Sequence, residues 1–140
     1  MTARLTPYLG FRDNARQAME FYTAVFGGET TFSTYGEASM SEDPADQDKI
    51  MHSQLEVPNG ILLMAGDVPG SMEPDAGSSI QISLSGGPED EAVLRGYWDG
   101  LADGATIREP LATAPWGDTF GMLTDKFGTS WLVNIGGTAA

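Results

Sequence analysis

The pattern of apolar and polar positions changes period several times along the chain, and the changes follow the same order in both halves. Runs typical of strands, in the first half, are residues 6–11, 30–35, 49–57 and 61–65. Those in the second half are 79–84, 106–111, 120–124 and 130–135. A stretch with helical spacing follows the first run of each half. Each half therefore reads strand, helix, strand, strand, strand, which indicates an internal repeat.

Tight turns join the last two strands of each half. The sequence Asp125-Lys126-Phe127-Gly128 separates two runs rich in β-branched and aromatic residues, a pattern typical of an antiparallel hairpin. Pro58-Asn59-Gly60 separates the corresponding runs in the first half. Both halves are thus expected to end in a hairpin.

The two helical stretches carry apolar residues on one face, which we interpret as core. The predicted buried residues of the first helix are Ala15, Met19, Tyr22, Val25 and Phe26. Those of the second are Ala92, Leu94, Tyr97, Trp98 and Leu101. Asp13 or Asn14 is expected to cap the first helix, Gly27-Gly28 to end it, and Pro88 to open the second.

The third predicted strand contains the single histidine of the chain. Because side chains alternate along a strand, His52 shares a face with Gln54 and Glu56, whereas Leu55 and Val57 lie on the other face. Leu55 and Val57 are suited to packing against a helix. His52 is therefore expected to face away from the helix, towards a cavity if the sheet is curved.

Composition narrows the class of protein. A chain of 140 residues with 41% apolar residues is expected to form one domain of two half-domains, about 3–67 and 78–136, with a linker at about 68–77. No apolar run approaches the roughly 20 residues of a membrane span, and the start lacks the features of a signal peptide, so a cytoplasmic protein is expected. The chain has no cysteine, which excludes thiol catalysis and disulfides.

The net charge of −13 makes nucleic acids and membranes poor partners, because phosphate groups would be repelled. Such a charge attracts cationic small molecules. The other interpretation is that the acidic residues only keep the protein soluble. Two loops remain open to interpretation. Residues 37–48 form either a disordered segment or a lid, and Trp116 is either a corner plug or a wall against which a ligand stacks.

Three stretches resemble the PhnB-like branch of the vicinal oxygen chelate superfamily, which includes glyoxalases, bleomycin-resistance proteins and extradiol dioxygenases. They are TPYLGFRDNARQAMEFYTAVFGG, HSQLEVPNGILLMAGD and WGDTFGMLTDKFGTSWLVN. The resemblance implies an α+β fold of paired βαβββ modules, whose curved mixed sheets form a cup with the helices outside, and a homodimer. It also implies a divalent metal bound by one residue from each of four strands.

The positions implied for those metal ligands are Pro7 or Tyr8, Leu63 or Met64, Ser79, and Leu132. None of these is a strong ligand for a divalent metal. His52 and Glu56 lie on one face but about 13 Å apart, too far to share an ion. We therefore expect no cofactor and no conventional metal site, with an unconventional one left open. A Ser-His-Asp site and a glycine-rich nucleotide loop are also absent from the sequence pattern.

Three functions remain open. The first is a protein that binds a small aromatic or cationic organic molecule without a metal. The predicted ligand-binding residues are Tyr8, His52, Gln54, Leu63, Gln81, Trp116, Met122, Leu132 and Asn134. The alternative is a lyase, isomerase or related enzyme that uses His52 as a general base or an unconventional metal site. The third is an interaction module whose cup is filled by its own side chains.

Overall fold

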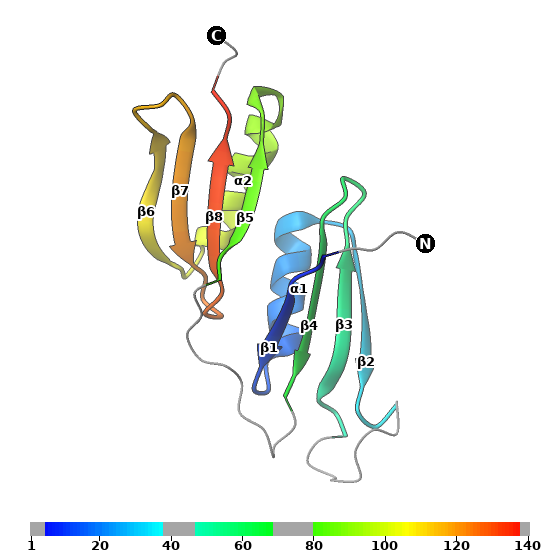
Figure 1. Cartoon of the computed structure of the whole chain (residues 1–140). Coiled ribbons are helices and arrows are strands. Elements are labelled where there is room, and N and C mark those ends of the chain that lie inside the picture. Colours follow the sequence, from blue (N-terminus) through cyan, green and yellow to red (C-terminus); the bar gives the residue numbers. More distant parts are fainter. Residues whose placement is uncertain (1–4, 38–46, 69–79, 138–140) are drawn as a thin grey trace. The chain divides into compact units, whose positions relative to one another are not determined.

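The computed structural model describes residues 5–37, 47–68 and 80–137. The chain divides after Gly77 into two units, residues 1–77 and 78–140, which we call module 1 and module 2. Each module is described by itself (Figure 1). Most of the predicted lid and linker, and Ser79, lie outside the described residues.

Both modules have the same topology. Module 1 consists of β1 (Tyr8–Phe11), α1 (Ala15–Phe26), β2 (Glu29–Thr34), β3 (Ile50–Glu56) and β4 (Leu62–Asp67). Module 2 consists of β5 (Ile82–Gly86), a 3₁₀ turn (Pro88–Asp90), α2 (Glu91–Ala102), β6 (Thr106–Thr113), β7 (Thr119–Thr124) and β8 (Ser130–Ile135). The strand orders are β1-β4-β3-β2 and β5-β8-β7-β6. The predicted α+β fold of paired βαβββ modules is confirmed.

Each sheet is mixed. The first strand of a module runs parallel to the last, as β1 does to β4 and β5 to β8, while the remaining neighbours are antiparallel. Each helix packs on one face of its own sheet (Figure 1). No helix among the described residues combines the length and apolar character that a membrane crossing requires.

The core of module 1 lies between α1 and the sheet. The helix buries Ala15, Ala18, Met19, Tyr22 and Phe26. Val25, predicted to be buried, is only half-buried, and Ala18 takes its place. Ala18 lies three residues after Ala15 and four before Tyr22, so it shares their face of the helix. Opposite them lie Leu55, Leu63 and Ala65, all buried on the sheet.

The core of module 2 is built in the same way. Helix α2 buries Leu94, Tyr97, Trp98 and Leu101. Ala92, which the sequence analysis placed in this set, is exposed. The prediction was wrong because Ala92 precedes Leu94 by two residues, about 200° around a helix of 3.6 residues per turn. The facing strand β8 buries Trp131, Val133 and Ile135.

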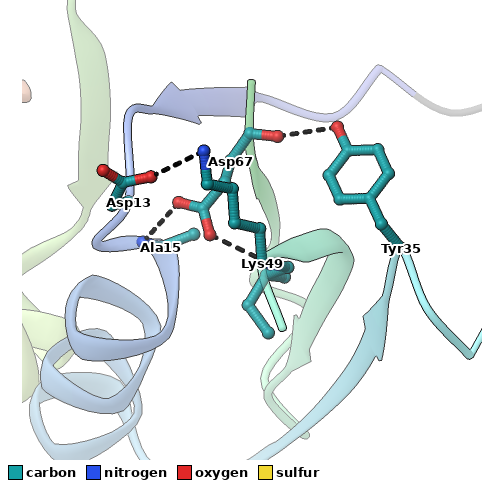
Figure 2. A network of polar contacts seen from close by, with 6 residues as sticks. Asp13, Ala15, Tyr35, Lys49 and Asp67 are labelled. Carbon is teal, nitrogen blue, oxygen red and sulfur yellow. Dashed lines mark hydrogen bonds and ion pairs between the residues drawn. The ribbon is translucent and has the colours of Figure 1, made fainter. Parts of the chain in front are cut away.

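A buried carboxylate caps helix α1 (Figure 2). Asn14 is the N-cap residue, but its side chain makes no capping hydrogen bond. Instead Asp67, 4% exposed at the end of β4, accepts a 2.9 Å hydrogen bond from the backbone N–H of Ala15 through Oδ1. Its Oδ2 accepts another, also 2.9 Å, from the N–H of Ile50. Asp67 therefore joins the starts of α1 and β3 to the end of β4.

Two further contacts strengthen this corner of module 1. The Tyr35 hydroxyl donates a 2.8 Å hydrogen bond to the backbone carbonyl of Asp67. Lys49 forms a 3.1 Å ion pair with Asp13, two residues before the first residue of α1 (Figure 2). The sequence prediction that Asp13 or Asn14 caps the helix is thus corrected: Asp13 binds a lysine, and the capping group comes from a distant strand.

Candidate functional site

Each sheet has one face towards its helix and one face away from it, which we call the open face. In module 1, Leu55 and Leu63 are paired across β3 and β4 and both are buried on the helix side. The adjacent pair, Gln54 and Met64, therefore lies on the open face. In module 2, Gly121 and Val133 are buried, so Met122 and Leu132 lie on the open face.

Tyr8 crosses the open face of module 1. Its hydroxyl donates a 2.9 Å hydrogen bond to the backbone carbonyl of Met51 in β3, although Tyr8 itself is in β1 and β4 lies between them. Gly66 makes this crossing possible. A Cβ atom at Gly66 would lie 2.9 Å from the Tyr8 hydroxyl and 2.6 Å from the Met51 carbonyl oxygen. The hydroxyl of Tyr8 thus lies next to Gly66, and the side chain stays 53% exposed.

Tyr8 and His52 form a pair of rings on this face. Their centroids are 5.7 Å apart and the planes are tilted by 32°. Burial, followed by the charge of Tyr35, raises the pKa of Tyr8 above its usual value of 10.0. The phenol therefore stays protonated at neutral pH and keeps its hydrogen bond to Met51.

Polar side chains continue the open face of module 1 beyond His52. Gln54 lies opposite Thr31 of β2 and donates a hydrogen bond to Glu56. The structure thus places His52 and Gln54 away from the helix, as their alternation with Leu55 predicts. Leu63 is the exception among the predicted cavity residues of this module: it is 2% exposed, in the core, and Met64 occupies the open face instead.

Module 2 brings together four of the residues predicted from the sequence. Met122 and Leu132 are paired across β7 and β8, and Asn134 is paired with Phe120 on the same face. Trp116, in the turn between β6 and β7, lies edge-on to Phe120 with the ring centroids 6.1 Å apart. The indole is 65% exposed, so Trp116 does not fill the corner of the turn.

Asp118 completes this cluster. Its Oδ1 accepts a 3.0 Å hydrogen bond from the N–H of Gly137, and its Oδ2 accepts a 3.2 Å hydrogen bond from the side-chain amide of Asn134. These bonds, with a smaller contribution from Trp116, lower the pKa of Asp118 below its usual value of 3.8. Asp118 is therefore an ionised carboxylate beside two aromatic rings. We call Trp116, Asp118, Phe120 and Asn134 the tryptophan cluster.

Sequence reasoning missed Phe120 and Asp118. Phe120 precedes Met122 by two residues, so period-2 alternation places it on the same face. Asp118 follows Trp116 by two residues, but its bond to Gly137 depends on where the chain continues after β8. Gln81, predicted to bind ligand, is exposed and precedes β5.

The residues at the ligand positions of the superfamily do not suit a divalent metal. Within the described part of the chain these positions hold Tyr8, Met64 and Leu132, of which Tyr8 already donates its hydroxyl proton to Met51. A thioether alone suits soft metal ions, and an aliphatic side chain has no donor atom for a metal. No three His, Cys, Asp or Glu side chains are grouped for metal binding in the same part of the chain.

Comparison with known proteins agrees with the fold. The profile of the family described as 3-demethylubiquinone-9 3-methyltransferase matches residues 3–134. Protein PA1353 from Pseudomonas aeruginosa is 34% identical, with a TM-score of 0.82 over 96% of this chain and 98% of that one. A PhnB protein from Bacillus cereus, described as a 3-demethylubiquinone-9 3-methyltransferase, is 25% identical, with a TM-score of 0.71 over 95% and 99%.

A more distant structure extends the likeness of the fold. The glyoxylase/bleomycin resistance protein/dioxygenase domain from Frankia sp. EAN1pec is 14% identical and has a TM-score of 0.68, over 100% of this chain and 96% of that domain. The family match, the topology of two βαβββ modules and these structures agree with one another. The chain belongs to the family described as 3-demethylubiquinone-9 3-methyltransferase, and it shares its fold with the glyoxylase/bleomycin resistance protein/dioxygenase domain.

Proposed function

We propose that the protein binds a small aromatic or cationic organic molecule on the open face of module 2, without a conventional metal site. The observation that carries the proposal is the tryptophan cluster, where an indole 65% exposed stands beside Phe120 and an ionised Asp118. Exposed aromatic rings with a few fixed polar groups are typical of sites for small organic ligands.

The polar part of the cluster is held in place before any ligand arrives. Asn134 donates to Asp118, and Asp118 also accepts from Gly137, so neither side chain is free to rotate. Fixed polar groups lose little conformational entropy on binding, which favours affinity. Met122 and Leu132 extend the face with half-buried apolar side chains next to the polar pair.

The methyl transfer named in the family description is not part of this proposal. Nucleotide-like cofactors bind at the switch point of a doubly wound parallel sheet. In the described part of each module the sheet has four strands, and one of its three neighbouring pairs is parallel. In module 1 the N-terminus of α1, where such folds bind ligands, already receives the Asp67 carboxylate.

The test is a binding titration with a panel of neutral and cationic aromatic compounds, followed by calorimetry. We expect at least one compound to bind with a micromolar Kd. Trp116→Ala should weaken its affinity about tenfold or more, because a tenfold change in Kd corresponds to about 1.4 kcal/mol of stacking energy. Trp116→Phe should keep most of the affinity, because a ring remains. Val93→Ala removes an exposed apolar side chain from α2, outside the open face, and serves as the control.

The proposal fails if no compound of the panel binds, or if Trp116→Ala binds as tightly as the wild type. A partial loss shared by Val93→Ala would indicate a general effect on the fold. Circular dichroism of each variant separates that case from loss of the site.

A second function is favoured by the Tyr8–His52 ring pair, which places an imidazole on the open face of module 1. An imidazole there is accessible for acid–base catalysis, as in an isomerase or lyase. His52→Ala would abolish turnover of any compound that the protein converts, whereas Tyr8→Phe would reduce it less. Turnover unchanged in His52→Ala would eliminate this function.

A further inference from the structure

We propose that Asp118 makes the tryptophan cluster selective for aromatic cations, so that one subsite recognises both the ring and the positive charge of the ligand. This inference rests on the proposed binding function and names its ligand class. It concerns four residues of module 2: Trp116, Asp118, Phe120 and Asn134.

The first argument is that the charge of Asp118 is not matched by a cation. Its hydrogen-bond partners are an amide N–H and a side-chain amide, both neutral. Within the described residues the ion pairs join Lys49 to Asp13, Arg95 to Glu91 and Lys126 to Asp103, and none includes Asp118. A full negative charge therefore remains next to the exposed indole.

Trp116 and Asp118 belong to one turn. Asp118 follows Trp116 by two residues in the same short turn. The turn is closed by a 2.7 Å hydrogen bond from the N–H of Ala114 to the carbonyl of Asp118. The turn thus holds the backbone positions of the indole and the carboxylate close together. A cation over an aromatic ring is attracted by the π electrons, and a neighbouring carboxylate adds to that attraction.

The third argument concerns the kind of cation. A carboxylate offers about four lone-pair positions, and neutral donors use two of those of Asp118, one on each oxygen. A primary ammonium ion carries three N–H donors, so the two remaining positions leave at least one of its donors without a partner on Asp118. A delocalised cation without such donors needs no free lone pair and stacks on the indole. The geometry therefore favours quaternary aromatic nitrogen.

The experiment uses two probes with the same ring system, N-methylquinolinium and quinoline, titrated at pH 8, where quinoline is neutral. We expect the wild type to bind N-methylquinolinium about tenfold more tightly than quinoline. Asp118→Asn should weaken binding of the cation about tenfold and leave binding of quinoline within about twofold. Asp99→Asn removes the same charge from the exposed side of α2 and should change neither affinity by more than about twofold.

The possible results separate this inference from the function on which it rests. Equal affinity of the wild type for both probes would overturn charge selection but leave aromatic binding standing. Failure of both probes to bind would overturn both. Equal losses in Asp118→Asn and Asp99→Asn would assign the effect to net charge and overturn the role of Asp118.

A second variant guards against loss of folding in Asp118→Asn. Asp118→Glu keeps the charge, and we expect it to retain a preference for the cation of at least about threefold, since the carboxylate remains beside the indole. Loss of the preference in Asp118→Glu, with thermal unfolding unchanged, would contradict the inference.

Discussion

At the scale of single residues, aspartates that accept several hydrogen bonds hold parts of the structure together. Asp67 joins two backbone N–H groups from α1 and β3. Asp125 accepts from the N–H groups of Phe127 and Thr129 and from the buried indole of Trp131. The acidity of the chain is therefore partly structural: these carboxylates replace backbone acceptors at the corners of the sheets.

Asp67→Asn tests this role. An asparagine offers one acceptor oxygen, and its NH₂ group would face a backbone N–H that also needs an acceptor. We expect a loss of about 1.5–3 kcal/mol in the free energy of unfolding, the range for hydrogen bonds to a charged group. Urea denaturation measures it. Asp13→Asn, which breaks only an ion pair whose aspartate is 62% exposed, should cost less than about 1 kcal/mol.

The lowered pKa of Asp118 predicts how the free energy of unfolding depends on pH. Its pKa is lower in the folded chain than the usual value of 3.8, so folding favours the ionised form. The stabilisation is complete above the unfolded value of about 3.9 and is lost as the pH falls through the lower folded pKa. The stability difference between wild type and Asp118→Asn should be constant from pH 7 to about pH 5 and shrink below about pH 4.

Denaturation curves at several pH values measure this difference. Asn134→Ala removes one hydrogen-bond donor to Asp118. It should therefore reduce the part of the free energy of unfolding that is lost at low pH. A wild-type minus Asp118→Asn difference that stays constant down to about pH 2 would contradict the assignment.

At the scale of elements, Tyr8 connects three strands of one sheet. Its backbone belongs to β1, its ring crosses β4 at Gly66, and its hydroxyl bonds to β3. Strand β1 has only four residues and pairs with β4 alone. The tyrosine thus adds a second attachment for a short edge strand.

Gly66→Ala should break that attachment. The added methyl group would meet the Met51 carbonyl oxygen at 2.6 Å, and backbone atoms cannot move aside as a flexible side chain can. We expect destabilisation of about 1–3 kcal/mol, as for overpacking elsewhere. Gly96→Ala is the matched control, because nothing lies within 4 Å of its added Cβ on α2. Gly96→Ala should stabilise the protein by roughly 0.5–1 kcal/mol, as chemical denaturation would show.

Local patterns predicted the elements well because each element has a regular period. Strand β8 was placed at residues 130–135, where it lies, and His52 was correctly turned away from Leu55. What depends on distant residues was not predicted. The cap of α1 comes from Asp67, 52 positions after Ala15, and no local pattern contains that pairing.

The candidate site was predicted with the same limits. Trp116, Met122, Leu132 and Asn134 were selected from one hairpin, where alternation fixes the face. The choice between Leu63 and Met64 depended on the register of β4, which only its pairing with β3 defines. Asp118 was missed because its partner Gly137 lies beyond the end of the hairpin.

At the scale of the whole molecule, the repeat keeps its topology and changes its chemistry. Gln54 and Met64 form a pair across β3 and β4, and Met122 and Leu132 form the corresponding pair across β7 and β8. The open face of module 1 is the more polar, with His52 and Gln54. That of module 2 carries aromatic and apolar side chains beside the Asp118–Asn134 pair. Duplicated modules of one fold thus offer different surfaces to a ligand.

The net charge of −13 adds a long-range contribution to cation binding. Salt screens charges beyond about 10 Å at 0.1 M and about 3 Å at 1 M. Raising sodium chloride from about 20 mM to 0.5 M should therefore weaken binding of N-methylquinolinium several-fold and leave binding of quinoline nearly unchanged. Calorimetric titration at both salt concentrations measures this. An equal effect on both probes would show that charge contributes nothing to recognition.

The parallel pairing of the first and last strands in each module governs the order in which the chain can fold during synthesis. Among residues 5–37, 47–68 and 80–137, strand β1 pairs only with β4, and β5 only with β8. While the ribosome makes residues 12–61, β1 has no partner in its sheet and remains available for wrong contacts. Module 1 can close only after Asp67 emerges, bringing both the partner of β1 and the cap of α1. A nascent chain halted before β4 would therefore be a target for chaperones, whereas one halted just after it would resist proteolysis.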